Sequence, residues 1–240
     1  MEVRINKYLA TVGVGARRKA DEMIAAGKVR INGKTAKLGA KIDPQKDKVE
    51  VSGKVVGQVQ EKVYIALNKP KDVVSTVIDT HGRRTVVDLV NFGKKLFPVG
   101  RLDQESEGLM LLTNDGDLAF KLTHPKFHIE KTYEVWVKGR LGPETIGRLA
   151  KGVKLEDGMT APAKVRILKE TEHNTLFEII LSQGKNRQIR RMCEALHLHI
   201  TGLKRVSIGL VRLGDLQIGK WRYLTDGEVS MLKGKIKSSF

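Results

Sequence analysis

A single aspartate, Asp103, is the residue on which a reaction in this chain could most readily depend. It follows Gly100-Arg101-Leu102, and a polar run at 104–107 separates it from an apolar segment that Gly108 opens. An aspartate in a loop between two expected strands can act as a nucleophile or a base. A turn aspartate that bonds its own backbone has the same local pattern, so this stretch alone leaves both interpretations open.

The charge of the chain indicates a polyanionic partner. Its 240 residues carry 44 Lys and Arg against 27 Asp and Glu, a formal net charge of +17, and nucleic acid is the commonest polyanion bound by such proteins. Cys193 is the only cysteine, which excludes an internal disulfide and a cysteine metal site. We find no metalloprotease histidine pair, phosphate loop or dinucleotide motif, and therefore expect no metal and no cofactor.

Hydropathy places the chain away from membranes. No apolar run reaches the roughly eighteen residues of a membrane helix. The sequence from Glu2 to Tyr8 lacks the apolar core of a signal peptide. We therefore expect a cytoplasmic protein.

A second polar stretch, 182–191, runs into a pattern typical of a helix. Its apolar positions recur at i, i+3, i+4 and i+7, namely Ile189, Met192, Cys193 and Leu196. Arg190 falls about 100° from Ile189, at the border of the expected buried face. A guanidinium there either meets a carboxylate or extends its head to solvent. Arg187 and Arg191 fall away from the stripe, and we expect them to face solvent or RNA.

Tyr133 lies in a segment, 131–137, that alternates between polar and apolar residues. The alternation predicts a strand with Tyr133, Val135 and Val137 on one face. The tyrosine ring could stack on a nucleic-acid base, or it could be an ordinary core or surface tyrosine. Taken alone, the pattern favours the ordinary tyrosine.

The other segments alternate between expected strands and helices, with residues 79–84 as an exposed basic loop and 86–90 ambiguous. The acidic cluster 113–117 lacks the ligand order of a calcium loop, so we interpret it as a strand-to-helix turn capped by Asn114 or Asp115. The expected strands or strand edges are 63–67, 73–77, 131–137, 165–168, 176–181, 203–209 and 216–221. The expected helices are 16–27, 143–152 and 225–232, the last opened by a Thr225-Asp226-Gly227-Glu228 capping box.

A run of cations opens the predicted helix 16–27. The helix dipole disfavours cations in a first turn, so they suggest phosphate contacts. The alternative is a solvated face on which Arg17 pairs with Asp21 and Arg18 pairs with Glu22. The segment 29–34 then predicts a hairpin with an Asn-Gly turn. The cations expected to contact RNA phosphates here are Arg17, Arg18, Lys19, Lys28, Arg30 and Lys34.

The order of these motifs resembles the alpha-L RNA-binding domain of a ribosomal small-subunit protein. The matching motifs are Arg4-Ile5-Asn6-Lys7-Tyr8-Leu9, Gly15-Ala16-Arg17-Arg18-Lys19-Ala20-Asp21 and Gly27-Lys28-Val29-Arg30-Ile31-Asn32-Gly33-Lys34. The resemblance covers nearly all of 2–56 and implies that the helix and hairpin lie on RNA. Since unrelated enzymes and stress proteins carry this module, it indicates a ligand class and not a reaction. We expect it to span 1–58, followed by a linker at 59–62 and a second domain at 63–240.

Three later motifs resemble the ribosomal RNA pseudouridine synthases of the small-subunit synthase (RsuA) family. These motifs are Gly100-Arg101-Leu102-Asp103, Lys131-Thr132-Tyr133 and Asn186-Arg187-Gln188-Ile189-Arg190-Arg191-Met192. The segments 183–193 and 67–70 look most like the branch that acts on large-subunit ribosomal RNA. The resemblance implies an α+β fold, in which a small alpha-L domain precedes a mixed, mainly antiparallel sheet with flanking helices. It also implies ribosomal RNA as the partner of a monomeric enzyme and a reaction without cofactor or metal.

The resemblance also implies a role for five residues. Asp103 would be the nucleophile or base near C1′ of the target uridine, and Arg190 the guanidinium that lowers the pKa of that carboxyl and positions it. Tyr133 would stack on the detached uracil while it turns, and Leu203 would pack under the base. Arg101 would fill the space left by the flipped uridine.

Two alternatives stay open. The same chemistry could act on small-subunit ribosomal RNA or on tRNA. A non-catalytic RNA-binding or ribosome-assembly protein would also explain the charge and the N-terminal module, but it requires no particular residue at positions 103, 133 and 190.

Overall fold

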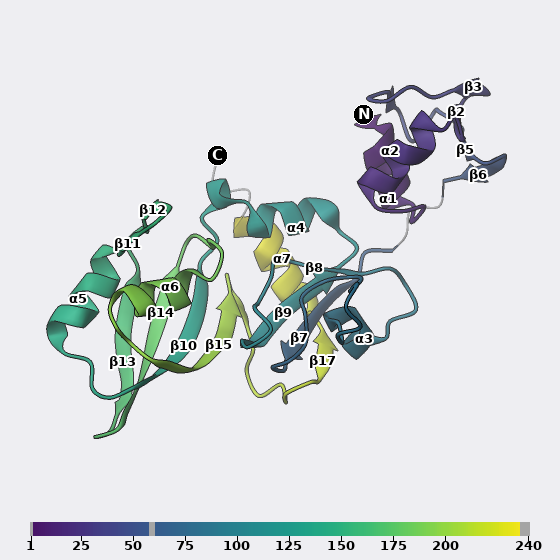
Figure 1. The fold of residues 1–240 in the computed structure, drawn as a ribbon. Helices are drawn as coiled ribbons and strands as arrows, with labels where there is room; N and C mark the ends of the chain where they lie inside the picture. Colours follow the sequence, from purple (N-terminus) through teal and green to yellow (C-terminus); the bar gives the residue numbers. More distant parts are fainter. Residues whose placement is uncertain (1, 58–60, 236–240) are drawn as a thin grey trace. The chain divides into compact units, whose positions relative to one another are not determined.

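A computed structural model describes residues 2–57 and 61–235 of the chain (Figure 1). The chain divides into two compact units, Met1–Lys62 and Val63–Phe240. The expected end of the first domain at 58 and the first half of the expected linker fall on 58–60, outside the described residues. No helix in the described ranges is long and apolar enough to cross a membrane.

The first unit combines two short helices with small antiparallel sheets around one core. Its core side chains include Ile5, Leu9, Ile24 and Val49. The elements are β1 Val3–Arg4, α1 Ile5–Thr11, α2 Arg17–Ala25, β2 Val29–Ile31, β3 Lys34–Thr35, β4 Lys41–Ile42, β5 Val49–Val51 and β6 Lys54–Val56. Strands β3, β2, β5 and β6 form one sheet in that order, and β1 pairs with β4. The predicted turn is present, with positive φ at both Asn32 and Gly33.

The second unit is built on a nine-stranded mixed sheet. Its strands are β7 Tyr64–Lys69, β8 Phe97–Pro98, β9 Glu107–Thr113, β10 Lys131–Lys138, β13 Lys164–Glu170, β14 Asn174–Leu181, β15 Ile200–Ile208, β16 Val211–Arg212 and β17 Trp221–Tyr223. The order is β13-β14-β10-β15-β9-β7-β17, with β16 on β15 and β8 on β9. Of these pairings only β15 with β9 is parallel. The predicted fold class, a mixed and mainly antiparallel sheet with flanking helices, is confirmed.

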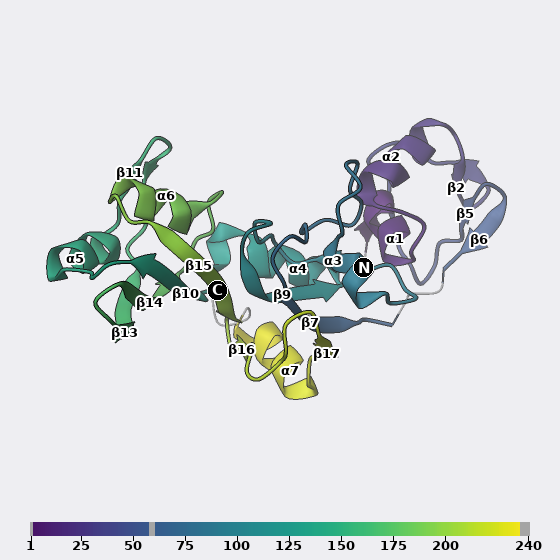
Figure 2. The same cartoon turned by 60° about the horizontal axis from the view of Figure 1, so that its bottom comes forward.

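Helices cover the two ends of this sheet separately (Figures 1 and 2). The helices are α3 Val86–Val90, α4 Gly116–Thr123, the 3-10 helix η1 Pro125–Phe127, α5 Pro143–Lys151, α6 Gln188–Ala195 and α7 Asp226–Lys235, and a hairpin joins β11 Lys154–Leu155 to β12 Gly158–Met159. Helices α5 and α6 lie by β13, β14, β10 and β15, whereas α3, α4 and α7 lie by β9, β7 and β17. Each end has its own buried clusters, one including Val135, Phe177 and Met192, others including Leu109, Leu111 and Met110.

The two ends of the sheet meet where β15 runs beside β9 at Gly108 and Arg205. Gly108 has φ +105°, and a Cβ there would lie 2.3 Å from the carbonyl oxygen of Arg205. Only glycine permits so close a backbone approach. The Arg205 side chain is buried and its Nε donates to the Leu109 carbonyl at 2.8 Å. The loop that carries Asp103 enters β9 at this junction.

Most expected elements are present, and two are wrong. Segment 73–77 is a loop with a single bridge from Val74 to Thr85, because Ser75 bonds the backbone of another loop instead of a strand ladder. Segment 216–220 forms turns, with positive φ at Gly219, and the strand begins only at 221. The ambiguous segment 86–90 is α3, which a Thr85–Asp88 capping box opens. The predicted caps of α4 (Asp115) and of α7 (Thr225 with Glu228) are confirmed.

Candidate active site

Asp103 lies in the loop between β8 and β9, and three neighbouring groups hold that loop. Ser75 Oγ donates to the Leu102 carbonyl at 2.7 Å and accepts from the Leu102 amide at 3.0 Å. The Ser106 amide donates to the Asp103 carbonyl at 3.1 Å. The Leu102 side chain is buried against the core. A loop with so many fixed backbone groups presents its carboxylate in a defined position.

Lys69 supports the same loop from below. Its ammonium is fully buried and donates to the carbonyls of Ser106 (2.7 Å), Pro70 (2.8 Å) and Gln104 (3.3 Å). Burial lowers the pKa of Lys69 from 10.5 to about 8, and the nearby Asp103 carboxylate partly opposes that shift. From the sequence, Lys69 entered only as part of the segment 67–70 that resembles the large-subunit branch, with no role of its own. A lysine closing an otherwise apolar strand is the signal that could have indicated a buried cation.

Two arginines flank the Asp103 carboxylate. Arg190 Nε lies 3.6 Å from Asp103 Oδ2, and Arg187 Nη1 lies 3.7 Å from the same oxygen. Both guanidinium groups also approach Glu105 Oε2, at 3.4 and 3.7 Å. Arg190 Nη2 donates to Ser106 Oγ at 3.1 Å, and the Arg190 side chain is only 15% exposed. Of the two possibilities that the spacing left open for Arg190, a carboxylate partner or a head extended to solvent, the structure shows the first.

Arg187 differs from the helical-wheel expectation, which pointed it away toward solvent or RNA. The wheel does not apply, because Arg187 precedes α6 and has φ +46°, the left-handed conformation. That backbone turn directs its guanidinium toward Asp103 and leaves the side chain 45% exposed. It therefore faces both the site and solvent.

Arg191 faces away from the apolar stripe as predicted, but it has a protein partner. Its Nη1 and Nη2 bond the two carboxylate oxygens of Asp157, at 3.0 and 3.3 Å. Lys185 Nζ lies 3.5 Å from Asp157 Oδ2 and donates to the Asp157 carbonyl at 3.1 Å. The turn between β11 and β12 thus anchors the outer face of the segment that carries Arg187 and Arg190. An RNA contact by Arg191 stays a prediction.

A small pocket of about 70 Å³ brings the candidate residues together. Tyr133 comes from β10 and Leu203 from the adjacent strand β15, where Tyr133 is paired with Arg205. Leu203 is 5% exposed, so it forms an apolar wall and not a polar contact. The candidate residues that line this pocket are Arg101, Asp103, Tyr133, Arg187, Arg190 and Leu203. The fold therefore joins residues that are up to about a hundred positions apart in the sequence.

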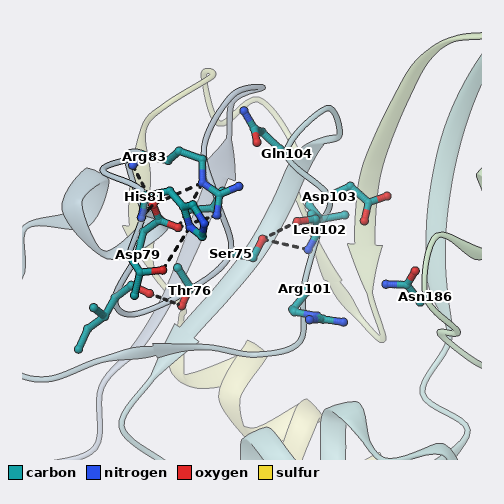
Figure 3. A pocket seen from close by; sticks show the side chains of 13 residues that line it. Ser75, Thr76, Asp79, His81, Arg83, Arg101, Leu102, Asp103, Gln104 and Asn186 are labelled. Atoms are coloured by element: carbon teal, nitrogen blue, oxygen red, sulfur yellow. Dashed lines mark hydrogen bonds and ion pairs between the residues drawn. The ribbon is translucent and has the colours of Figure 1, made fainter.

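A larger pocket of about 410 Å³ adjoins the small one and shares Arg101, Leu102 and Asp103 with it (Figure 3). Its far wall is the loop from Ser75 to Arg83. The prediction that 79–84 is an exposed basic loop is confirmed. Its position beside Asp103 was not predicted.

The cations expected on the first unit are all exposed there: Arg17, Arg18, Lys19, Lys28, Arg30 and Lys34. The alternative intrahelical pairs do not form between the residues proposed. Asp21 accepts from the Asn6 amide, at 3.0 and 3.1 Å, and Glu22 pairs with Lys19 at 3.1 Å. The guanidinium groups of Arg17 and Arg18 thus remain available for an anion.

Residues 63–195 match the family model described as RNA pseudouridylate synthase, and residues 3–49 match the S4 domain. The chain belongs to the RNA pseudouridylate synthase family. As the sequence motifs predicted, it is thus an RNA pseudouridine synthase, an isomerase, with an RNA-binding S4 domain in front. The candidate residues of the second unit lie in the segment that the family model covers, except Leu203, which follows it.

Individual relatives of this RNA pseudouridine synthase match along almost the whole chain. It is 42% identical over 234 residues to the ribosomal large subunit pseudouridine synthase B of Bacillus subtilis, covering 96% of this chain and 95% of that protein. It is 41% identical over 239 residues to the dual-specificity RNA pseudouridine synthase RluF of Escherichia coli, covering 99% and 80%. A crystal structure of a pseudouridylate synthase is similar with a TM-score of 0.69 and 32% identity, covering 96% and 99%.

Proposed function

We propose that this RNA pseudouridine synthase converts uridine to pseudouridine in large-subunit ribosomal RNA, with Asp103 as its reactive carboxylate. The relative from Bacillus subtilis, named for the ribosomal large subunit, supports this substrate. The net charge of +17 supports a large polyanionic one. We also propose that the enzyme acts as a monomer, since one chain supplies Asp103, both arginines and Tyr133 to one pocket.

The observation that carries the role of Asp103 is its position between two guanidinium groups. Asp103 Oδ2 lies within 3.7 Å of both Arg190 and Arg187, in a pocket that also holds an aromatic ring. The two guanidinium groups can orient the Asp103 carboxylate toward a substrate in the pocket. An ionised carboxylate can attack C1′ of the ribose or remove a proton, and the fixed loop presents it without reorganisation.

The isomerisation breaks the bond between N1 and C1′ and forms one between C5 and C1′. The proton on C5 leaves to solvent and N1 gains one, so atoms and electrons balance without an external reagent. The detached uracil has to stay bound while it turns. We propose that Tyr133 stacks on its ring, since stacking fixes a plane more than an in-plane angle. Leu203 supplies the apolar surface on which the base packs.

The uridine has to leave any RNA helix before it can enter the small pocket. We propose that Arg101, which lines the pocket beside Asp103, fills the vacated space. The exposed cations of the S4 domain would contact RNA phosphates, and Arg187 and Arg191 would contact phosphates near the target. The S4 cations are Arg17, Arg18, Lys19, Lys28, Arg30 and Lys34.

The test maps pseudouridines in large-subunit and small-subunit ribosomal RNA and in tRNA from a strain that lacks the gene. The missing pseudouridine is then restored in vitro with wild-type protein, Asp103→Asn or the control Asp215→Asn, which changes an exposed turn aspartate. We expect the loss in large-subunit RNA, restoration by wild type and Asp215→Asn, and none by Asp103→Asn despite unchanged RNA binding. A loss confined to tRNA or small-subunit RNA would overturn the substrate. Activity of Asp103→Asn would overturn the role of this carboxylate.

A further inference from the structure

The larger pocket has no role in the proposed isomerisation of a single uridine. Its volume of about 410 Å³ lies within the roughly 300–1,000 Å³ of pockets that hold small ligands. The stacking ring Tyr133 and the arginine Arg190 both line the small pocket instead. The two pockets meet only along Arg101, Leu102 and Asp103. Asp103 therefore lies between the small pocket, which holds the other residues proposed for the reaction, and the larger pocket.

The far wall of the larger pocket is held in a defined shape by its own hydrogen bonds. The Asp79 carboxylate accepts from the backbone amides of His81 (2.9 Å) and Arg83 (2.8 Å). It also accepts from Arg83 Nε and Nη2, the latter at 2.7 Å. Ser75 fastens the start of this loop to the backbone of Leu102. A preformed wall lowers the entropic cost of ordering a ligand against it.

Polar side chains without protein partners line the larger pocket on the side opposite the Ser75–Arg83 loop. Figure 3 shows Asn186 across from the Asp79 loop, with Leu102 and Asp103 between them. Within residues 2–57 and 61–235, no hydrogen bond or ion pair engages the side chains of Arg101, Gln104 or Asn186. Carboxamides pair with the edges of bases. Asn186 and Gln104 thus give the larger pocket groups that can pair with a base.

We propose that the larger pocket binds the nucleotide directly next to the target uridine in the RNA chain. The inference rests on the proposed function, because it places the target at Asp103 and the small pocket. The neighbouring base would lie against the Ser75–Arg83 loop, with the carboxamides of Asn186 and Gln104 at its edge. Recognition of this neighbour would select one uridine among many, since the reaction pocket itself reads only uracil.

The test uses an RNA hairpin that carries the uridine found by the mapping experiment. Three variants of it replace the 5′ neighbour, the 3′ neighbour or a nucleotide three positions away by an abasic nucleotide. Each RNA is assayed with wild type, Asn186→Ala and the control Asn174→Ala, which removes an exposed asparagine carboxamide that lines neither pocket. The readout is kcat/KM for pseudouridine formation.

We expect the abasic nucleotide at one neighbouring position to lower kcat/KM of the wild type by about 5- to 100-fold, the range for loss of one recognised base. Asn186→Ala should lower kcat/KM on the intact hairpin. The abasic nucleotide at the same position should then lower kcat/KM of Asn186→Ala by a markedly smaller factor than it lowers that of wild type. Asn174→Ala should behave as wild type. A purely structural effect of Asn186→Ala would instead leave the full abasic penalty in place.

Two results would overturn the inference while leaving the proposed function intact. One is that the wild type tolerates an abasic nucleotide at both neighbouring positions. The other is that Asn186→Ala and the abasic substitution act additively. If wild type forms no pseudouridine in the intact hairpin or in the full-length RNA, the proposed function fails first and the inference with it.

Discussion

Arg190 touches both the Asp103 carboxylate and the far end of the loop that carries it. Its Nε lies 3.6 Å from Asp103 Oδ2, and its Nη2 donates to Ser106 Oγ at 3.1 Å. One guanidinium from α6 thus bridges two points of the loop between β8 and β9. Because α6 packs on the other end of the sheet from β9, this bridge also ties the two walls of the active site together.

Arg190→Lys should separate charge from geometry at this bridge. A lysine keeps the positive charge but cannot reach Asp103 and Ser106 with a planar fork. We expect kcat to fall about tenfold or more, about 1.4 kcal/mol in the activation barrier, with KM for RNA changed little. Arg148→Lys, on the exposed face of α5, is the matched control and should leave both constants unchanged. A wild-type kcat for Arg190→Lys would show that charge alone suffices.

The S4 domain should set the salt dependence of RNA binding without affecting the chemistry. Removing two exposed cations with Arg17→Ala and Lys19→Ala should weaken binding to a ribosomal RNA fragment and reduce the slope of log K against log salt by about 1 to 2. At saturating RNA, the rate of pseudouridine formation should stay at the wild-type value. The control pair Arg148→Ala with Lys151→Ala removes equal charge from α5 and should retain the slope. An unchanged slope in the S4 variant would argue against phosphate contacts there.

Lys69 should make stability increase with pH in the alkaline range. Its pKa is about 8 in the folded protein against 10.5 when unfolded, so between these values the unfolded chain binds more protons and the free energy of unfolding rises with pH. The cost of holding the buried charge is present in full below pH 8. Urea unfolding of wild type and Lys69→Met at pH 7.5 and 9.5 measures this effect.

The difference between wild type and Lys69→Met isolates Lys69 from other groups. Burial raises the pKa of the Cys193 thiol to about 12, which opposes the trend as pH approaches 9, but this contribution is common to both proteins. Burial also lowers the pKa of Lys131 to about 8 in both. We expect wild type to gain stability relative to Lys69→Met on going from pH 7.5 to 9.5. An equal pH response of the two proteins would contradict a perturbed Lys69.

The Cys193 thiol should be inert in the native protein. It is fully buried on the face of α6 that packs into the core, and burial raises its pKa to about 12, so little thiolate forms at pH 8. We expect no reaction with Ellman's reagent until denaturant unfolds the chain, and then one equivalent. Ser230→Cys, at an exposed position of α7, should add one equivalent that reacts at once. Rapid native reaction of the wild type would mean that α6, which carries Arg190, is not firmly docked.

Local patterns predicted one helix of the candidate active site and some of its residues. The spacing of Ile189, Met192, Cys193 and Leu196 predicts α6 and its buried face, and all four side chains are buried. The same wheel places Arg190 at the border, where the energetic cost of an unpaired charge calls for a carboxylate. Motif resemblance then singled out Asp103, Tyr133 and Leu203. The α6 inference is confirmed because helix periodicity depends on neighbours close in sequence, whereas the roles of Asp103, Tyr133 and Leu203 stay predictions.

Other features depend on contacts that no local pattern specifies. Arg187 turns toward Asp103 because its backbone is left-handed before α6, which a wheel drawn through the helix cannot show. Segment 73–77 has the residues of a strand, yet Ser75 forms hydrogen bonds with the Leu102 backbone and not with a neighbouring strand. The segment therefore forms part of the wall of the larger pocket. Arg191 is paired because a turn more than thirty residues away supplies Asp157.

The sequence by itself determined the fold class and the family and singled out Asp103 as the candidate reactive residue, because residue types at short spacings encode periodicity, caps and motif chemistry. Only the tertiary structure decided what surrounds that aspartate. Lys69 became the buried support of its loop because the closing residue of β7 lies beneath Gln104 and Ser106. The second pocket beside Asp103 exists because three loops distant in sequence converge there. Such convergence is set by strand order and core packing, which are properties of the whole chain.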